Sequence, residues 1–205
     1  MRSRRLEYSE STREALVDSA LDLFTERGYA STSLDEVAKR ARVTKGALYH
    51  HFAGKQALFE AVFDQVEQGS MSRLAEILGQ GTGDVWDSVM EGLRQFMKVC
   101  LEPAYQRVVI HEGPVVMGWQ RWKECEDRYG FNVVRAGVEL LVNSEVIEDL
   151  PVDTTARLLF GALSSGATLI AGSDDPQATS EEVFATLVRL LEGHRRCNPG
   201  KNAVG

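Results

Sequence analysis

The chain has 205 residues, of which 43% are hydrophobic and 26% charged, and its formal net charge is −7 at pH 7. That length allows one small and one medium domain with a substantial core. A negative net charge argues against a protein that coats nucleic acid without regard to sequence. The charge is unevenly distributed, however. Residues 1–55 carry ten Lys or Arg against eight Asp or Glu, whereas the remainder carries thirteen against twenty-two.

Composition also bears on the compartment. No run of about eighteen apolar residues could cross a bilayer, and no apolar region follows the basic N-terminus as in a secretion signal. The cysteines Cys100, Cys125 and Cys197 are odd in number and widely spaced. This pattern favours reduced thiols, with a redox sensor as the alternative, over a disulfide framework. We therefore expect a cytoplasmic protein that does not associate with a membrane.

Residues 1–9 are predicted to form a basic arm that includes Arg2, Arg4 and Arg5. Such an arm is either a solubilising tail or a segment that follows a phosphate backbone or enters a minor groove. A first helix is predicted from about Thr12 to Arg27, ending at Gly28. Apolar residues recur along it at helical spacing, namely Leu16, Ala20, Leu23 and Phe24.

Two short helices are predicted next, over residues 33–52. In the first, apolar residues mark one face: Leu34, Val37, Ala38 and Ala41. Ser33 and Glu36 have the spacing of a capping box at its start. Only Arg42 to Thr44 remain for the connection, and Thr44 can cap the second helix. This is the pattern of a helix-turn-helix motif.

The second short helix has a small, polar and aromatic face. At 100° per residue, one side carries Lys45, Gly46, Tyr49 and His50, and the other carries Ala47, Leu48 and Phe52. Gly46 allows a close approach to a phosphate or base edge, at a cost of roughly 1 kcal/mol relative to Ala. This face suits a DNA groove, although a helical hairpin with a solvated basic face has the same spacing. His51 lies at the edge of the inner face, where packing and a phosphate contact are both possible.

The same segment carries a longer motif. Its residues, in order, are Ala20, Leu23, Phe24, Gly28, Thr32, Val43, Thr44, Gly46, Leu48, Tyr49, His51, Phe52, Lys55 and Leu58. In these positions, and over about residues 10–70, the chain resembles the TetR family of bacterial transcriptional regulators. Arg42 departs from the family pattern, which usually has Gly there; a left-handed backbone at this point would be strained by roughly 1 kcal/mol. Asp35 also departs, since some members have a basic DNA contact at that position.

The resemblance implies roles for individual residues. It implies major-groove contacts for Lys45, Gly46, Tyr49 and His50, and phosphate contacts for Thr32, Ser33, Thr44, His51 and Lys55. It also implies a dimer that binds double-stranded operator DNA with an inverted repeat. Repression, and release by a small apolar or amphipathic effector, follow from the same resemblance.

The rest of the chain has helical periodicity and no convincing strand, so the predicted fold class is all-α. A fourth helix begins near Lys55, and Gly79, Gly81 and Gly83 break the chain after it. Further helices are predicted over about residues 85–100, 104–112, 119–143, 153–172 and 176–195, with a break and possible hinge at 111–114. We predict a helix-turn-helix domain over residues 10–70, a ligand-binding and dimerisation domain over 71–195, and a flexible tail over 196–205.

Aromatic and sulfur-bearing residues in the middle of the chain could line an apolar pocket, with Arg107 or His111 as polar anchors. The predicted ligand residues are Trp86, Phe96, Met97, Cys100, Tyr105, Arg107, His111, Met117, Trp119 and Trp122. The alternative for most of them is an ordinary core.

Small residues and leucines in the last two helices predict a dimer interface built as a four-helix bundle. Its predicted residues are Leu158, Gly161, Ala162, Ser165, Gly166, Leu169, Val183, Leu187, Leu190 and Leu191. The alternative is that these residues pack inside one subunit. Thr179 and Glu182 are spaced as a capping box for the final helix.

An enzyme has little support in the sequence. His50 and His51 point about 100° apart on a helix, and no cluster at metal-ligand spacing, phosphate-binding glycine loop or nucleophile elbow is present. We expect neither metal nor cofactor. The alternative to a DNA-binding regulator is a helical ligand-binding or protein-adaptor module whose N-terminal hairpin binds a protein.

Overall fold

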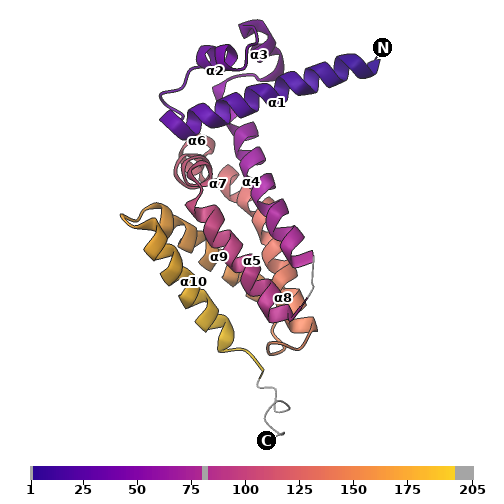
Figure 1. Cartoon of the computed structure of the whole chain (residues 1–205), viewed down its shortest axis with the longest axis vertical. Coiled ribbons are helices and arrows are strands. Elements are labelled where there is room, and N and C mark those ends of the chain that lie inside the picture. The colour runs from indigo at the N-terminus through magenta and orange to yellow at the C-terminus, as the bar shows by residue number, and fades with distance from the viewer. Residues whose placement is uncertain (1, 80–82, 197–205) are drawn as a thin grey trace, which may run out of the picture. The chain divides into compact units, whose positions relative to one another are not determined.

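The computed structural model describes residues 2–79 and 83–196, with side chains from Tyr8 onward. Within that part it contains helices and no β-strand, and one isolated antiparallel bridge joins Ile147 and Arg195. The prediction of an all-α fold is confirmed (Figure 1). No helix among the described residues is both long and apolar enough to span a membrane.

The helices fall into two compact units. The first comprises residues up to Gly69 together with Glu102–Glu126, and the second comprises Ser70–Leu101 together with the chain from Asp127. The first contains α1 (Arg2–Arg27), α2 (Leu34–Arg40), α3 (Lys45–His51), the first part of α4 (Lys55–Gly79), η1 (Tyr105–Glu112), α6 (Gly113–Met117) and α7 (Trp119–Glu126). The second contains the end of α4, α5 (Val85–Leu101), η2 (Asp127–Phe131), α8 (Asn132–Asn143), α9 (Val152–Ala171) and α10 (Pro176–Glu192). The first segment of the first unit ends at Gly69, next to the predicted domain boundary at residue 70. The unit also includes Glu102–Glu126, which the sequence analysis assigned to the second domain.

The first helix is longer than predicted. It begins at Arg2, so the backbone of residues 2–9 is helical and the predicted start near Thr12 is wrong. No Gly or Pro occurs between Arg2 and Arg27, and hence no residue there breaks a helix. The side chains of Arg2, Arg4 and Arg5, for which DNA contact was considered, lie outside the described side chains, as do Cys197 and most of the predicted tail. The helix ends as predicted, with Gly28 in the left-handed region at φ 83°.

The middle of the chain contains two π-helical turns that the sequence did not indicate. The predicted break at residues 111–114 is wrong, because η1 runs directly into α6 and Gly113 keeps a helical φ of −50°. Pro114 is tolerated there because it lies in the first turn of α6. The helix ends instead at Met117, before Gly118 with φ 81°. In the predicted helix over 119–143, η2 separates α7 from α8. Single π-turns, the length of the five-residue η2, often occur at functional sites.

Each unit has its own apolar core. In the first, the fully buried side chains include Leu16 and Phe24 of α1, Leu48 of α3, and Leu58, Phe59 and Phe63 of α4. In the second, Trp86, Met90, Leu141 and Ile147 form a buried cluster with Leu150 and Leu191 packed against it. The apolar stripe predicted for the first helix therefore faces the core that carries the hairpin α2–α3.

Candidate nucleic-acid interface

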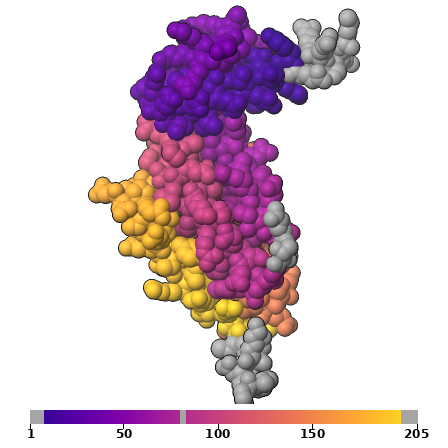
Figure 2. All heavy atoms as spheres, viewed as in Figure 1, coloured from indigo at the N-terminus to yellow at the C-terminus, as the bar shows by residue number. Residues whose placement is uncertain are grey.

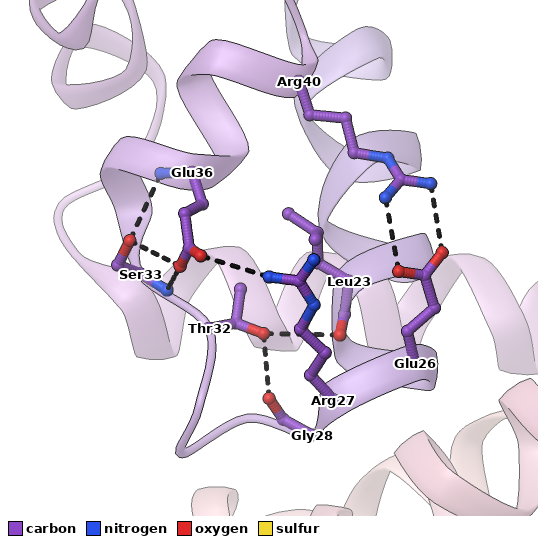
Figure 3. Close-up of polar contacts among 8 residues, drawn as sticks. All are labelled: Leu23, Glu26, Arg27, Gly28, Thr32, Ser33, Glu36 and Arg40. Atoms are coloured by element: carbon purple, nitrogen blue, oxygen red, sulfur yellow. Dashed lines mark hydrogen bonds and ion pairs between the residues drawn. The ribbon is translucent and has the colours of Figure 1, made fainter.

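The hairpin α2–α3 is specified at both helix starts by its own side chains. The Ser33 hydroxyl accepts a hydrogen bond from the Glu36 amide at 3.2 Å, and the Glu36 carboxylate accepts from the Ser33 amide at 2.9 Å. The hydrogen bonds that the Ser33 amide and the Ser33 hydroxyl donate to the Glu36 carboxylate lower the pKa of Glu36. Thr44 caps α3 by accepting from the Ala47 amide at 3.1 Å. Both predicted caps are confirmed, and the two helices begin where the sequence placed them (Figure 3 shows the Ser33 box).

The turn between the two helices has a left-handed residue. Arg42 has φ 57°, and its amide donates to the Lys39 carbonyl at 3.2 Å while Val43 donates to Ala38 at 3.0 Å. The backbone is therefore left-handed at the position where the family usually has Gly, and Arg42 occupies it without the freedom of glycine. The Arg42 side chain is exposed.

The loop before α2 corrects one predicted DNA contact. Thr32 is only 2% exposed, and its hydroxyl contacts the Leu23 carbonyl at 3.3 Å and the Gly28 carbonyl at 2.9 Å (Figure 3). A hydroxyl buried in this way satisfies carbonyls at the C-terminus of α1. The prediction that Thr32 contacts a phosphate is therefore wrong for this structure.

Ion pairs hold α2 against α1. Arg27 reaches Glu36 at 3.2 Å, and Arg40 reaches Glu26 at 3.2 Å (Figure 3). Arg40 also reaches Asp22 at 2.9 Å. The hydrogen bond to Glu26 is the main reason why the pKa of Arg40 is raised. The side chains of Arg27 and Arg40 therefore join α2 to α1 by ion pairs within the protein. In contrast, Lys39 and Arg42 have no ion pair or side-chain hydrogen bond within the described residues, and both are exposed.

Helix α3 is oriented as its periodicity predicts. Leu48 is fully buried, whereas Lys45, Gly46, Tyr49 and His50 are exposed, with Tyr49 at 50%. A Cβ atom added to Gly46 would have no neighbour closer than the Thr44 hydroxyl at 3.9 Å, so the backbone there is open to a partner. His51 is partly buried, and burial lowers its pKa, with smaller effects from His50 and Arg13. Its ring is therefore neutral near pH 7, as packing would require.

Lys55 has a structural role that the sequence did not show. Its ammonium donates to the Ala30 carbonyl at 3.3 Å and lies 4.3 Å from the centroid of the Tyr29 ring. Burial lowers its pKa, against the attraction of Glu112 and Glu36. The side chain thus fixes the connection between α1 and α2, although an ammonium has three donors and retains others for a phosphate.

An acid and a base meet on the outer side of the hairpin. The Lys45 ammonium, at the start of α3, lies 2.7 Å from one carboxylate oxygen of Asp35 and 3.0 Å from the other. Asp35 is in the first turn of α2. This hydrogen bond is the main cause of a raised pKa for Lys45, and Tyr49 adds to it. The sequence placed Lys45 on a DNA-facing side but did not connect it to Asp35.

Two family models match this chain, one over the hairpin and one over the C-terminal part. The family model for "Bacterial regulatory proteins, tetR family" matches residues 16–62, and the model for "Tetracyclin repressor-like, C-terminal domain" matches residues 86–194, more than half of the chain. A crystal structure of a TetR-family transcriptional regulator from Pectobacterium atrosepticum is 30% identical, with a TM-score of 0.82 over 93% of this chain and 97% of that one.

The chain belongs to the TetR family. It is a ligand-responsive, DNA-binding transcriptional regulator that acts as a dimer, and the protein-adaptor alternative is not favoured. Two further relatives are receptors by name. The A-factor receptor protein of Streptomyces griseus is 38% identical over 183 residues, covering 88% of this chain and 62% of that protein. A crystal structure of a gamma-butyrolactone receptor is 25% identical, with a TM-score of 0.53 over 91% of this chain and 98% of that one.

The residues predicted to bind the effector of this TetR-family regulator are divided between the units. Trp86, Phe96, Met97 and Cys100 lie on α5 in the second unit, and the other six lie on η1, α6 and α7 in the first. Trp86 belongs to the apolar cluster of its unit, under the Arg195 guanidinium at 4.8 Å from the ring centroid, so an ordinary core accounts for it. His111 and Trp119 are exposed.

Arg107 was predicted as a polar anchor for a ligand, but it contacts Glu112 and the end of α1 at Gly28. It pairs with Glu112 at 3.3 Å, and its guanidinium lies against Gly28 where a side chain would otherwise stand. The Glu112 carboxylate accepts from the Tyr29 amide, with both oxygens at 2.9 Å. Residues of η1 therefore hold the loop that follows α1.

Two buried carboxyl groups lie in the same unit and were missed in the sequence. Glu67 of α4 and Glu126 of α7 are 2% and 5% exposed. Tyr105 donates to Glu67 at 3.5 Å, and Lys123 pairs with Glu126 at 3.2 Å. Burial, followed by the charge of Glu126, raises the pKa of Glu67 to about 8. No group of three or more His, Cys, Asp or Glu within residues 2–79 and 83–196 is arranged to hold a metal ion.

The predicted dimer residues separate into exposed and internal sets. On α9, Leu158, Gly161, Ser165 and Leu169 are exposed and recur at helical spacing, and Leu190 is exposed on α10. Figure 2 shows α10, in yellow, at the surface of the second unit. Gly166 and Leu187 are buried, and a Cβ at Gly166 would come within 2.7 Å of Val183.

Gly166 thus faces Val183 of α10 within one chain, and Leu187 is buried in that chain, which corrects their assignment to the dimer interface. The predicted Thr179 cap is also wrong. Asp175 caps α10 by accepting from the Ala178 amide at 3.0 Å, and the Thr179 hydroxyl is hydrogen-bonded to Ser173 at 2.7 Å.

Proposed function

We propose that this regulator is a repressor that docks α3 of each subunit in the major groove of an inverted-repeat operator and is released by a small apolar or amphipathic effector. The observation that carries the proposal is the exposed face of α3, fixed by caps at the starts of both hairpin helices. Dimers of helix-turn-helix proteins place their two recognition helices in half-sites one helical turn, or a multiple of it, apart. The inverted repeat follows from the two-fold symmetry of such a dimer.

The proposed contacts follow from which groups are exposed and which hydrogen-bonding groups are not already used within the protein. Base edges are assigned to Lys45, Gly46, Tyr49 and His50, all exposed on one side of α3. The Thr44 oxygen accepts from Ala47, which leaves its hydroxyl proton for a phosphate. The Ser33 hydroxyl lies 2.7 Å from Glu36, so a phosphate contact would compete with the capping box.

Further phosphate contacts come from the neutral His51 ring and from cations around the hairpin. We retain His51 and Lys55, omit Thr32, and add Lys39 and Arg42 because their side chains are exposed and make no internal ion pair within the described residues. Charged groups of this kind position a protein on the DNA backbone without reading sequence. Arg42 is an apt example, since a residue strained in the left-handed region is retained where glycine would fit.

The effector proposal draws on the named relatives. The A-factor receptor and the gamma-butyrolactone receptor resemble this chain over most of its length. We propose an effector of the same kind, small and amphipathic, and we retain Phe96, Met97 and Cys100 of α5 as candidate contacts in the second unit. Its binding and operator binding should weaken each other by the same factor, typically 5 to 150-fold.

The exposed small and apolar residues of α9 and α10 are proposed as the dimer interface. Leu158 and Leu169 are 71% and 62% exposed on the same face of α9, and Leu190 of α10 is 58% exposed. Exposed apolar residues that gather on one face, unlike single ones, mark an interaction surface. Gly161→Arg is a suitable test, since no atom lies within 4 Å of a Cβ at that position and one chain can accommodate the change. The variant should remain helical but become monomeric in sedimentation, and it should lose tight operator binding.

The experiment that tests the function is selection of bound duplexes from sheared genomic DNA, followed by titration of a recovered site at several salt concentrations. We expect an inverted repeat and an affinity that falls steeply with salt, because neutralised phosphates release counterions. Tyr49→Ala should weaken binding to that site. Salt-insensitive binding, or full affinity in a Tyr49→Ala and Lys39→Ala double variant, would contradict docking through α3. We further propose that the protein works in the cytoplasm, where operator DNA is accessible, and without catalysis.

A further inference from the structure

An acidic side chain on a DNA-binding surface calls for a reason. Asp35 is exposed on α2, and its carboxylate meets only the Lys45 ammonium, at 2.7 and 3.0 Å, among the described contacts of the hairpin. The neighbouring Glu36 differs, because it completes the capping box and pairs with Arg27. Asp35 takes no part in the caps or the buried core that hold α2 in place.

The ion pair contributes little to the fold. The Lys45 and Asp35 side chains are 60% and 65% exposed, and an exposed pair between flexible side chains adds little to stability. Near a phosphate the carboxylate would be repelled. Asp35 lies beside Lys45, a proposed base contact. Base edges carry hydrogen-bond donors as well as acceptors, so the Asp35 carboxylate could accept a hydrogen bond from a base.

The chemistry of the pair matches one base pair in the major groove. A guanine presents the acceptors O6 and N7, and its paired cytosine presents the N4 amino donor beside them. The ammonium has three donors, and the carboxylate has two oxygens with about four acceptor positions, so each group retains capacity after binding the other. The pair thus offers a donor and an acceptor side by side, held together across two helices.

We propose that Lys45 and Asp35 together read one G·C base pair in each operator half-site, Lys45 donating to the guanine and Asp35 accepting from the cytosine amino group. Asp35 is then a specificity-determining residue on α2, and it also positions Lys45. This inference rests on the proposed docking of α3 in the major groove.

The test is binding selection from a duplex library randomised at every half-site position, using the full-length protein and three variants. Wild type should prefer G·C at one position in each half-site by about tenfold or more. Asp35→Ala should lose that preference while keeping the others. Asp35→Asn should shift the same position toward A·T, because an amide pairs with adenine N6 and N7. Asp22→Ala is the matched control, since it removes an exposed acid of α1 that pairs with Arg40 instead.

Circular dichroism should show the same helical content in all four proteins. An Asp35→Ala variant that binds every duplex more tightly, with its sequence preferences unchanged, would overturn the inference and leave Asp35 a merely repulsive charge. An Asp35→Ala variant with the sequence preferences and the affinity of the wild type would also overturn the inference. If wild type selects no duplex at all, the proposed DNA docking itself fails, and the inference fails with it.

Discussion

In the first unit, several polar side chains of one element bind backbone groups of another, whereas in the second unit the ion pairs between helices join exposed side chains, Arg135 with Asp153 and Arg157 with Asp127, and helices approach closely at small residues. Glu112 binds the Tyr29 amide, Lys55 the Ala30 carbonyl and Thr32 the carbonyls at the end of α1. In the second unit, Gly130 faces Phe160 and Gly166 faces Val183, where added Cβ atoms would lie 2.7 Å from the facing side chains.

This difference suits the two tasks. Hydrogen bonds fix position and direction, as an interface that reads base edges requires. Close packing of side chains brings two helices together and leaves their outer faces free for a partner. The first unit should therefore respond to pH and to the loss of single polar groups, and the second to changes in side-chain size.

The largest expected effect is a dependence of stability on pH through Glu67. Its pKa is about 8 in the folded protein and near 4.5 when unfolded, so the folded state binds the extra proton between these values. The stabilisation is fully present below about pH 4.5 and is lost as pH rises through 8, at up to about 1.4 kcal/mol per pH unit. Glu67→Gln should flatten this slope in urea unfolding measured between pH 5 and 8. Parallel slopes for the two proteins would show that Glu67 does not hold the proton.

Loss of the Glu112 carboxylate should have the next largest effect. Glu112→Ala leaves the partly buried Tyr29 amide without its acceptor and Arg107 without its partner, and we expect a loss of about 2 kcal/mol in the free energy of unfolding. Glu112→Gln keeps an oxygen for the amide and should lose less. Urea unfolding at pH 7 measures both, and equal losses would mean that the hydrogen bond to Tyr29 contributes nothing.

In the second unit the matched pair is Gly166→Ala and Gly137→Ala. The methyl group at Gly166 meets Val183, a side chain with little freedom to rotate, whereas at Gly137 the nearest atom is Val89 Cγ1 at 3.9 Å. Overpacking costs about 1–3 kcal/mol, and alanine returns up to about 1 kcal/mol in a helix. Thermal unfolding should therefore show Gly166→Ala destabilised by about 1 kcal/mol and Gly137→Ala stabilised. A stabilised Gly166→Ala would mean that α9 and α10 separate readily.

The smallest effect on stability is expected at Arg42. Arg42→Gly relieves a left-handed backbone but loosens the unfolded chain, and the net gain should be below about 1 kcal/mol. Operator affinity should fall, and the salt dependence should decrease by about one charge. Arg42→Asn serves as the control, because asparagine tolerates this conformation but has no charge. If either variant binds the operator as tightly as wild type, Arg42 does not contact a phosphate.

Several features of the hairpin could be predicted from sequence because they depend on residues only a few positions apart. The Ser33 box, the Thr44 cap and the end of α1 at Gly28 are all of this kind. The inward face of α3 follows from the helical period, with Leu48 buried and Tyr49 exposed. The same local reasoning failed at residues 2–9, where an arm was expected although nothing there breaks a helix.

The sequence by itself thus determined the helical class, the hairpin and the outward face of α3. Tertiary structure decided the rest, because packing brings together groups that are far apart in the chain: Tyr29 with Glu112, Tyr105 with Glu67, and Lys55 with Ala30. Packing also determined that Thr32 is buried, that Gly166 faces Val183 while Gly161 stays open, and that Lys45 meets Asp35. A residue's type and spacing define what it can do. Its burial and its partners, which depend on the whole fold, define which of those roles remain open to it.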